Sequence, residues 1–283
     1  LGMVAMARGR WAEQFRSDFL ETLDRAPDRA EFVFQGHLCL AEVSVYALGS
    51  ADTLPMVEEL MAVAERRGNL AGQALAHLLS GAPARCTGRL AEARAEYARA
   101  LALYEEMGYD AGQALALIRL AGVAVADGRP EEALALLERA GPLAERSELA
   151  PHHRVQVFEW RVAAAPTPES RLSVVEEAER TLVRAHVCGP CSIGFCVASA
   201  IACADSGEVA KAHKCLNEAE RLAGMWRGGP WLAATWEARA HLRLAEGNSG
   251  QAGALLQEAA NLFAESGRPL DAARCLAAVA APV

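Results

Sequence analysis

The sequence predicts an all-α fold, an α-solenoid of stacked helix pairs with a period of about 40 residues. The segment Ala-Gly-Gln-Ala-Leu-Ala at 71–76 recurs unchanged at 111–116, forty positions later. The chain is 52% hydrophobic but only 6% aromatic and is rich in alanine, which favours close-packed helices over a β-sandwich. Glycines that lead into helical patterns recur at the same interval, with a proline where one is due. These positions are Gly9, Gly49, Gly88, Gly128, Pro168, Gly207 and Gly247.

Each unit reads as two helices of different character. In the stretch 89–107 the apolar residues fall three and four apart, which is typical of an amphipathic helix with one buried stripe. The stretch 110–126 is apolar almost all round and is interrupted only by Gln113 and Arg119. Such a helix has to be covered on more than one side. The stripe of the first helix consists of Leu90, Ala93, Tyr97, Leu101 and Tyr104.

Glycines and prolines mark the ends of these helices. Gly108 and Gly128 stand where a helix stops and a turn with positive φ is needed. Pro83 falls inside an inner helix and should break or kink it around Ser80. The stretch 163–170 contains two prolines and should replace a tight turn by a longer loop.

The repeat resembles the tetratricopeptide family over nearly the whole chain. Each unit has a small residue at a close-packing point, an aromatic such as Tyr97 in the second helix, and a Gly or Pro between units. The period is longer than the roughly 34 residues usual in that family, which longer helices would explain. The resemblance implies a right-handed solenoid with a groove and a single array over 1–283.

The two ends of the sequence do not have the pattern of capping repeats. Residues 1–6 align with 120–125, the second half of an inner helix, and the inner-type helix at 270–280 has no outer partner. Since solenoids need capped ends, we expect this array to be a piece of a larger multidomain protein.

Composition argues against several classes of function. The net charge is −8 without a basic block, so this segment should make no direct contact with nucleic acid. No apolar run reaches the roughly twenty residues of a membrane span, and eight cysteines in 283 residues suggest reduced cytoplasmic thiols. Because the chain has no phosphate loop, nucleophile elbow or His-Glu-x-x-His motif, we expect neither an enzyme nor a cofactor or metal site.

The segment from Cys188 to Cys191 reads Cys-Gly-Pro-Cys, a spacing used by redox proteins of the thioredoxin type. A thiolate at Cys191 would be stabilised if a helix begins near Pro190. The alternative is that Gly-Pro forms an inter-helix turn and the cysteines pack the next helix. A zinc site with His186 or Cys196 would lack a second cysteine pair.

Three of the five tryptophans fall within eleven residues. Trp226 and Trp231 flank a Gly-Gly-Pro turn, next to Arg227, and Trp236 follows in the next inner helix. Trp236 occupies a mostly apolar column of the repeat, so it can belong to the core. Otherwise these indoles, with Arg227, form an aromatic wall for a small ligand or a peptide. Arg119, midway along an apolar helix, either contacts a ligand in the groove or pairs with a carboxylate.

The sequence is also similar to the long helical arrays of large bacterial transcription regulators, which carry an NTPase module and a LuxR-type helix-turn-helix domain. The likeness rests on the 40-residue units, on 188–195 and on 267–275. It implies an array that receives a signal, as a small-molecule effector or a protein partner, and passes it to other domains of the parent chain. The alternatives are a general protein–protein interaction scaffold and a thiol redox switch at Cys188 and Cys191.

Overall fold

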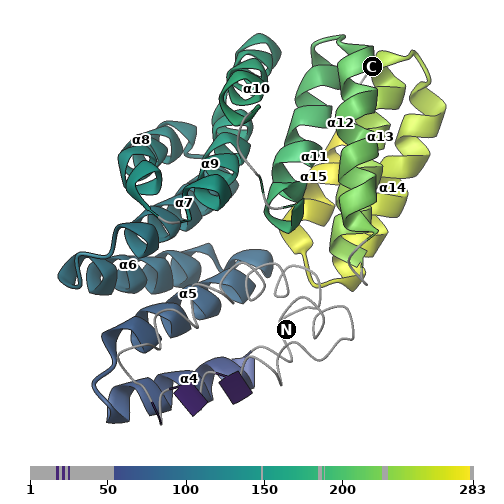
Figure 1. Ribbon diagram of the computed structural model, residues 1–283. Helices are drawn as coiled ribbons and strands as arrows, with labels where there is room; N and C mark the ends of the chain where they lie inside the picture. The colour runs from purple at the N-terminus through teal and green to yellow at the C-terminus, as the bar shows by residue number, and fades with distance from the viewer. Residues whose placement is uncertain are drawn as a thin grey trace.

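The computed structural model describes residues 54–147, 149–183, 187, 189–224 and 229–280, together with the single residues 17, 18, 21, 22 and 25. Over these ranges the regular structure is α-helix without strands, so the predicted all-α fold is confirmed (Figure 1). The helices are α4 (Leu54–Arg66), α5 (Leu70–Cys86), α6 (Leu90–Glu106), α7 (Asp110–Ala126), α8 (Pro130–Arg146), α9 (Ala150–Ala164), α10 (Pro168–Leu182), α11 (Gly189–Asp205), α12 (Val209–Ala223), α13 (Gly229–Ala245), α14 (Ser249–Glu265) and α15 (Pro269–Ala280).

Glycine turns set the period of the array. Gly108 and Gly128 have φ of 63° and 69°, as predicted, and the helix between them has 17 residues. After Gly108, the amide of Tyr109 donates to the carbonyl of Tyr104 at 2.9 Å, the 6→1 bond of a Schellman motif. Seven glycines in the described ranges adopt this left-handed conformation, and two helices with their turns take forty residues. They are Gly68, Gly88, Gly108, Gly128, Gly207, Gly247 and Gly267.

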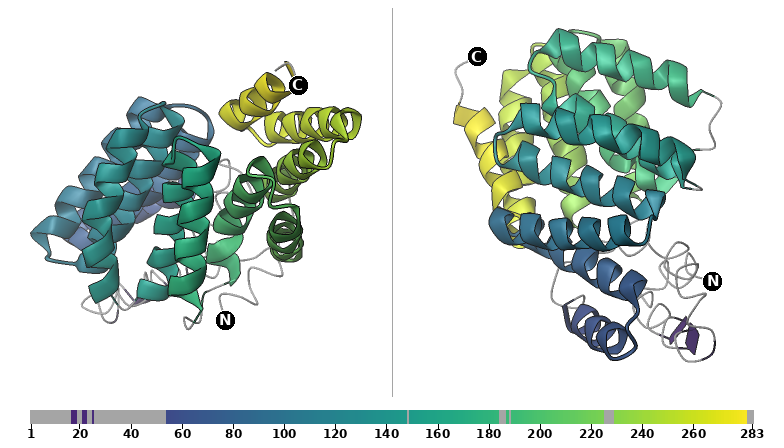
Figure 2. Two further views of the ribbon diagram at one scale, coloured as in Figure 1. Left: turned by 90° about the horizontal axis from the view of Figure 1, so that it is seen from above. Right: turned by 90° about the vertical axis from the view of Figure 1, so that its left-hand side faces the viewer.

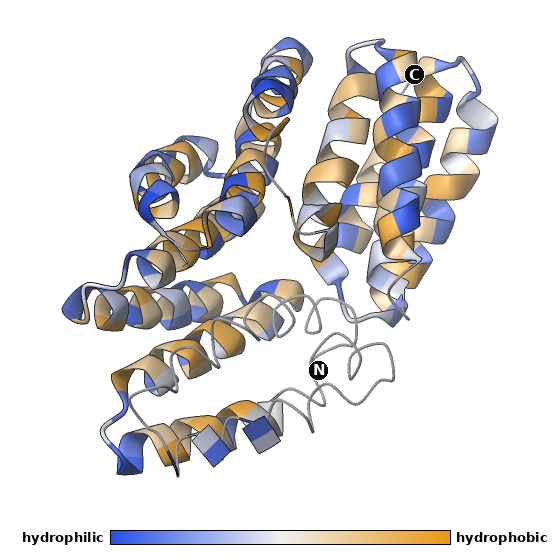
Figure 3. Cartoon of the chain, in the orientation of Figure 1, coloured by the Kyte–Doolittle hydropathy of each residue, from blue (hydrophilic) through white to orange (hydrophobic). Residues whose placement is uncertain are grey.

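The inner helices are buried on two sides, which explains their continuous apolar character. On α7, Leu115 and Leu120 belong to a cluster shared with α4, α5 and α6. On the same helix, Leu117 and Ile118 belong to a different cluster, shared with α8 and α9. Each helix pair thus supplies the next with apolar cover, as a solenoid requires. Figure 3 shows the orange residues gathered between the helices and the blue residues on the outside.

Two expectations about proline are wrong. Helix α5 runs without a break from Leu70 to Cys86 through the buried Pro83. Pro83 lies three residues before the helix end, so only the last turn loses a hydrogen bond. The link between α9 and α10 is a turn of three residues, 165–167, and not a longer loop. There Thr167 caps α10, and its hydroxyl accepts a hydrogen bond from the Ser170 amide at 3.2 Å.

The array curves, so that two turns far apart in the sequence come together. Helices α4 to α10 form one stack, α11 to α15 form a second, and α9 and α10 pack against α11 where they join (Figures 1 and 2). Far along the chain, the turn after α5 meets the beginning of α15. A Cβ atom on Gly88 would lie only 3.5 Å from Leu270 Cγ. Both stacks therefore border the concave face of the solenoid.

Candidate functional site

The concave face contains a cavity of about 370 Å³. Among the described residues, its walls come mainly from the inner helices α7, α9, α11, α13 and α15, with single contributions from α5, α10 and α14. This volume lies at the lower end of the range of about 300–1,000 Å³ that is usual for small-ligand pockets. The apolar part of the lining includes Val125, Ile193, Val197, Ile201 and Phe263.

The charged lining carries an excess of guanidinium groups. Among the described residues, five arginines and three carboxylates line the cavity, a formal charge of +2 in a chain whose net charge is −8. The arginines are Arg85, Arg119, Arg171, Arg268 and Arg274, and the acids are Glu159, Glu237 and Asp271. Charges interact more strongly in an enclosed site than on an open surface, because less water screens them.

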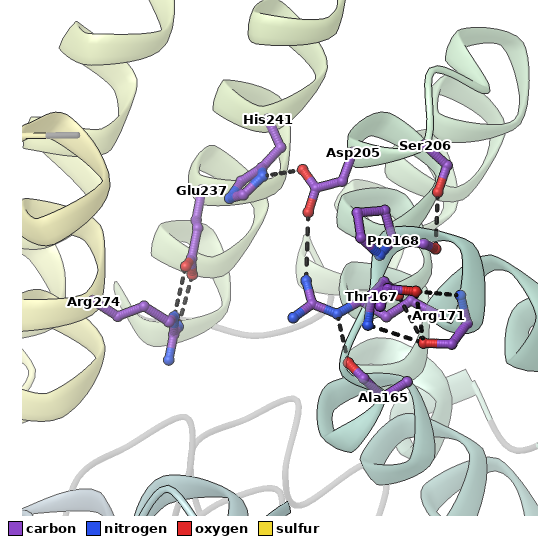
Figure 4. Close-up of polar contacts among 10 residues, drawn as sticks. Ala165, Thr167, Pro168, Arg171, Asp205, Ser206, Glu237, His241 and Arg274 are labelled. Atoms are coloured by element: carbon purple, nitrogen blue, oxygen red, sulfur yellow. Dashed lines mark hydrogen bonds and ion pairs between the residues drawn. The ribbon is translucent and has the colours of Figure 1, made fainter. Parts of the chain in front are cut away.

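One wall is an ion-pair network between α13 and α15. Arg274 donates from Nε and Nη2 to the two carboxylate oxygens of Glu237, at 2.7 and 2.8 Å (Figure 4). Its Nη1 donates to Asp271 at 2.7 Å. Burial alone would raise the pKa of Asp271, but Arg274, Arg268 and Arg85 outweigh it and hold that pKa below its usual value. The charge of Arg85 on α5 is thus felt by Asp271 on α15.

A second wall ties α10, α11 and α13 together. Arg171 Nε donates to the carbonyl of Ala165 at 3.0 Å, and its Nη1 lies 3.6 Å from Asp205 Oδ2 (Figure 4). The other oxygen of Asp205 lies 2.6 Å from His241 Nδ1. Arg171 is therefore held at the cavity by a backbone carbonyl and a carboxylate.

Arg119 is the most buried arginine of the described lining, with 6% of its surface exposed. It lies midway along α7, and its Nη2 donates to the neutral Gln156 Oε1 on α9 at 3.2 Å. Its positive charge reaches the neighbouring His153. Burial, with contributions from Arg119 and His152, lowers the pKa of His153 to about 3. Arg119 thus lies in the cavity lining, beside Gln156.

Part of the cavity wall is the Trp160 ring with the Arg85 guanidinium group stacked on it, which the sequence does not predict. The Arg85 guanidinium carbon lies 5.3 Å from the centroid of the Trp160 ring, a cation–π arrangement. The ring rests on α7 at Gly122, where a Cβ atom would come within 2.8 Å of Trp160 Cζ2. The signal in the sequence is weak, since it consists of one glycine in an apolar helix and one large aromatic in the next inner helix.

The structure separates the predicted aromatic residues. Trp231 lines the cavity, on the first turn of α13. Trp236 instead packs between α13 and α14, against a core cluster that contains Ala240 and Leu256. Trp226 and Arg227 lie outside the described residues. Of this predicted group, the described cavity brings together only Trp231 and Arg119.

Cys191 also lines the cavity, in the first turn of α11. Its side chain is 5% exposed, and Sγ lies 3.3 Å from His152 Nδ1. Cys188, its partner in the predicted redox pair, lies outside the described residues. Burial raises the pKa of Cys196, one turn later, to about 12. Within the described ranges no group of three or more His, Cys, Asp or Glu side chains has the geometry to hold a metal ion.

Comparison with known proteins gives few relatives. No protein-family model and no curated protein matches the chain. Among solved structures, the chain is similar to a tetratricopeptide repeat protein from Parabacteroides merdae, with 14% sequence identity and a TM-score of 0.35. That match covers 91% of this chain and 99% of the other. None of the helices in the described part of the chain is both long and apolar enough to cross a membrane.

Proposed function

We propose that this array is a ligand-receiving domain, which binds a small molecule in the cavity between its two stacks and passes the signal to other domains of a larger regulatory protein. The observation that carries the proposal is that both stacks line the cavity. Its walls include Arg85 and Arg119 from the first stack and Trp231 and Arg274 from the second. A ligand in this space touches both stacks at once.

Such a position gives ligand binding a mechanical consequence. The stacks are joined where α9 and α10 pack on α11, and they meet again where Gly88 approaches Leu270. A ligand that contacts both walls favours the closed arrangement by the difference in its affinity for the closed and open arrangements. The ends of the array would then move relative to each other, and attached domains would sense that movement.

A neutral fluorescent probe tests the proposal without knowledge of the natural ligand. N-phenyl-1-naphthylamine should bind the full chain with a fluorescence increase that saturates at one probe per protein. The substitution Ala198→Phe adds a ring to the cavity lining on α11 and should abolish that binding. Ala135→Phe, at an exposed position on the outer helix α8, is the matched control and should bind like the wild type. Unsaturable binding, or equal binding by A198F, would contradict the proposal.

A protein-interaction scaffold is the second candidate. It is favoured by the apolar residues exposed on α15, where Leu276 and Val279 are 45% and 42% exposed and lie three positions apart. If the probe does not enter the cavity of a folded protein, the scaffold becomes the better description.

A further inference from the structure

We infer that the ligand of this cavity is a small organic anion with a flat aromatic body, whose acidic group is held by the arginines of the inner helices. The inference rests on the proposed function and adds the chemical class of the ligand. It combines three features of the lining, namely its charge, one deeply buried guanidinium group and its aromatic surfaces.

The charge of the lining selects an anion. Arg274 and Arg268 face the two acids of their own wall, Glu237 and Asp271. On the opposite side Arg85, Arg119 and Arg171 accompany one lining carboxylate, Glu159, and Arg171 also pairs with Asp205 behind the lining. With Asp205 counted, one positive charge remains in excess among the described residues, on the α5, α7 and α10 side of the cavity. An excess of this size suits one negative charge, as in a carboxylate or sulfonate, better than a polyphosphate.

Arg119 gives the cavity a built cationic centre. Its guanidinium group is nearly fully buried at the cavity wall, and burying such a charge costs free energy unless hydrogen bonds and opposite charges surround it. A ligand carboxylate would supply charge-assisted hydrogen bonds, which are roughly twice as strong as neutral ones. The fork of an arginine matches the two oxygens of a carboxylate.

The remaining lining favours a flat apolar body. Trp160 and Trp231 contribute indole rings, and Ile193 and Val197 contribute aliphatic surface. Such surfaces suit an aromatic ring system, because flat rings stack on indole faces.

Two probes that differ only in a sulfonate group test the inference. 8-Anilinonaphthalene-1-sulfonate is N-phenyl-1-naphthylamine with one added acidic group. We expect the sulfonate to bind the wild-type protein at least about tenfold more tightly than the neutral probe, the effect of one charge-assisted contact. Competition should repeat the preference, with 2-naphthoate displacing the bound probe at lower concentration than 2-naphthamide.

Charge-removing variants locate the contact. Arg119→Met and Arg85→Gln should each weaken the sulfonate at least about fivefold and change the neutral probe less than about twofold. Arg139→Gln removes a charge from the outer helix α8, where the side chain is 59% exposed, and should change neither probe. If circular dichroism shows that R119M does not fold, R85Q decides the question.

The outcomes separate the two claims. If the neutral probe binds one site and the sulfonate binds no more tightly, the ligand is not an anion but the proposed function stands. Equal losses in R85Q and R139Q would likewise overturn the anion assignment. If neither probe binds one saturable site, the receiving cavity itself is refuted.

Discussion

The ring of Tyr97 occupies the space that a side chain on Gly81 would need. A Cβ atom on Gly81 would lie 2.5 Å from Tyr97 Cε1, closer than real side chains approach each other. Tyr97, on α6, is fully buried, and Gly81 lies on the preceding inner helix, α5. The same relationship recurs between Gly112 and Tyr104 and between Gly122 and Trp160. Glycines in the inner helices are therefore sites where aromatic rings from neighbouring helices pack.

The first prediction is that Gly81→Ala destabilises the protein although alanine favours helices. Displacing the Tyr97 ring should cost about 1–3 kcal/mol in overpacking, more than the gain of about 1 kcal/mol in helix propensity. The free energy of unfolding in urea measures the net change.

Gly253→Ala is the matched control, because a Cβ atom there would meet nothing within 4 Å in the interior of α14. It should raise the free energy of unfolding by about 0.5–1 kcal/mol. An equal gain for both variants would show that the Tyr97 ring can move aside freely.

The contrast between these glycines and the cavity indicates what the sequence alone can predict. Helix ends at Gly108 and Gly128, and the two-sided burial of α7, follow from local periodicity, and the structure has them. The meeting of Arg85 with α15 depends on the curvature summed over many helix pairs, which no local pattern encodes. Arg119 stands out in the sequence because it interrupts an apolar helix. The place of Trp160 in the cavity wall depends on this curvature, so the sequence does not predict it.

A second prediction concerns acid stability. Burial and the charge of Arg119 lower the pKa of His153 to about 3, whereas an unfolded histidine titrates near pH 6.5. Below about pH 6.5, His153 therefore binds a proton in the unfolded chain but not in the folded protein. The free energy of unfolding consequently decreases as the pH falls toward 3. This residue alone should lower the free energy of unfolding by about 2 kcal/mol between pH 7 and pH 5.

His153→Gln removes this titration and keeps a polar group beside Ser147, whose Oγ lies 3.3 Å from His153 Nδ1. Urea denaturation at pH 7 and pH 5 should give the variant a smaller loss than the wild type. Identical losses would mean that His153 accepts a proton without unfolding.

A third prediction concerns the pair formed by Arg274 and Glu237. Glu237 is 4% exposed, so Arg274→Met leaves a buried carboxylate without its bidentate partner. We expect a loss of about 1–3 kcal/mol in the free energy of unfolding. The double variant E237Q/R274M should be more stable than R274M alone, since a neutral amide is easier to bury than an unpaired charge.

Arg221→Met is the comparison for an exposed pair. Arg221 and Glu218 are 60% and 46% exposed, and breaking such a pair should cost less than about 1 kcal/mol. Arg274 is itself 56% exposed, so the two pairs differ mainly in the burial of the carboxylate. If the substitutions at Arg274 and Arg221 cost the same, the burial of Glu237 does not strengthen its pairing with Arg274.

A fourth prediction uses Cys191 to report on the cavity and on the redox hypothesis. Access to the Cys191 Sγ is limited, because the side chain is 5% exposed and lies in the cavity lining. Alkylation by iodoacetamide, followed residue by residue by mass spectrometry, should therefore be slower at Cys191 than at the half-buried Cys86. Saturation with 8-anilinonaphthalene-1-sulfonate should slow the alkylation of Cys191 further and leave that of Cys86 unchanged, because of these two only Cys191 lines the site.

A redox switch requires in addition that mild oxidant removes two free thiols and that Cys188→Ser abolishes the change. If oxidation proceeds equally in that variant, Cys191 serves the cavity wall and not a disulfide.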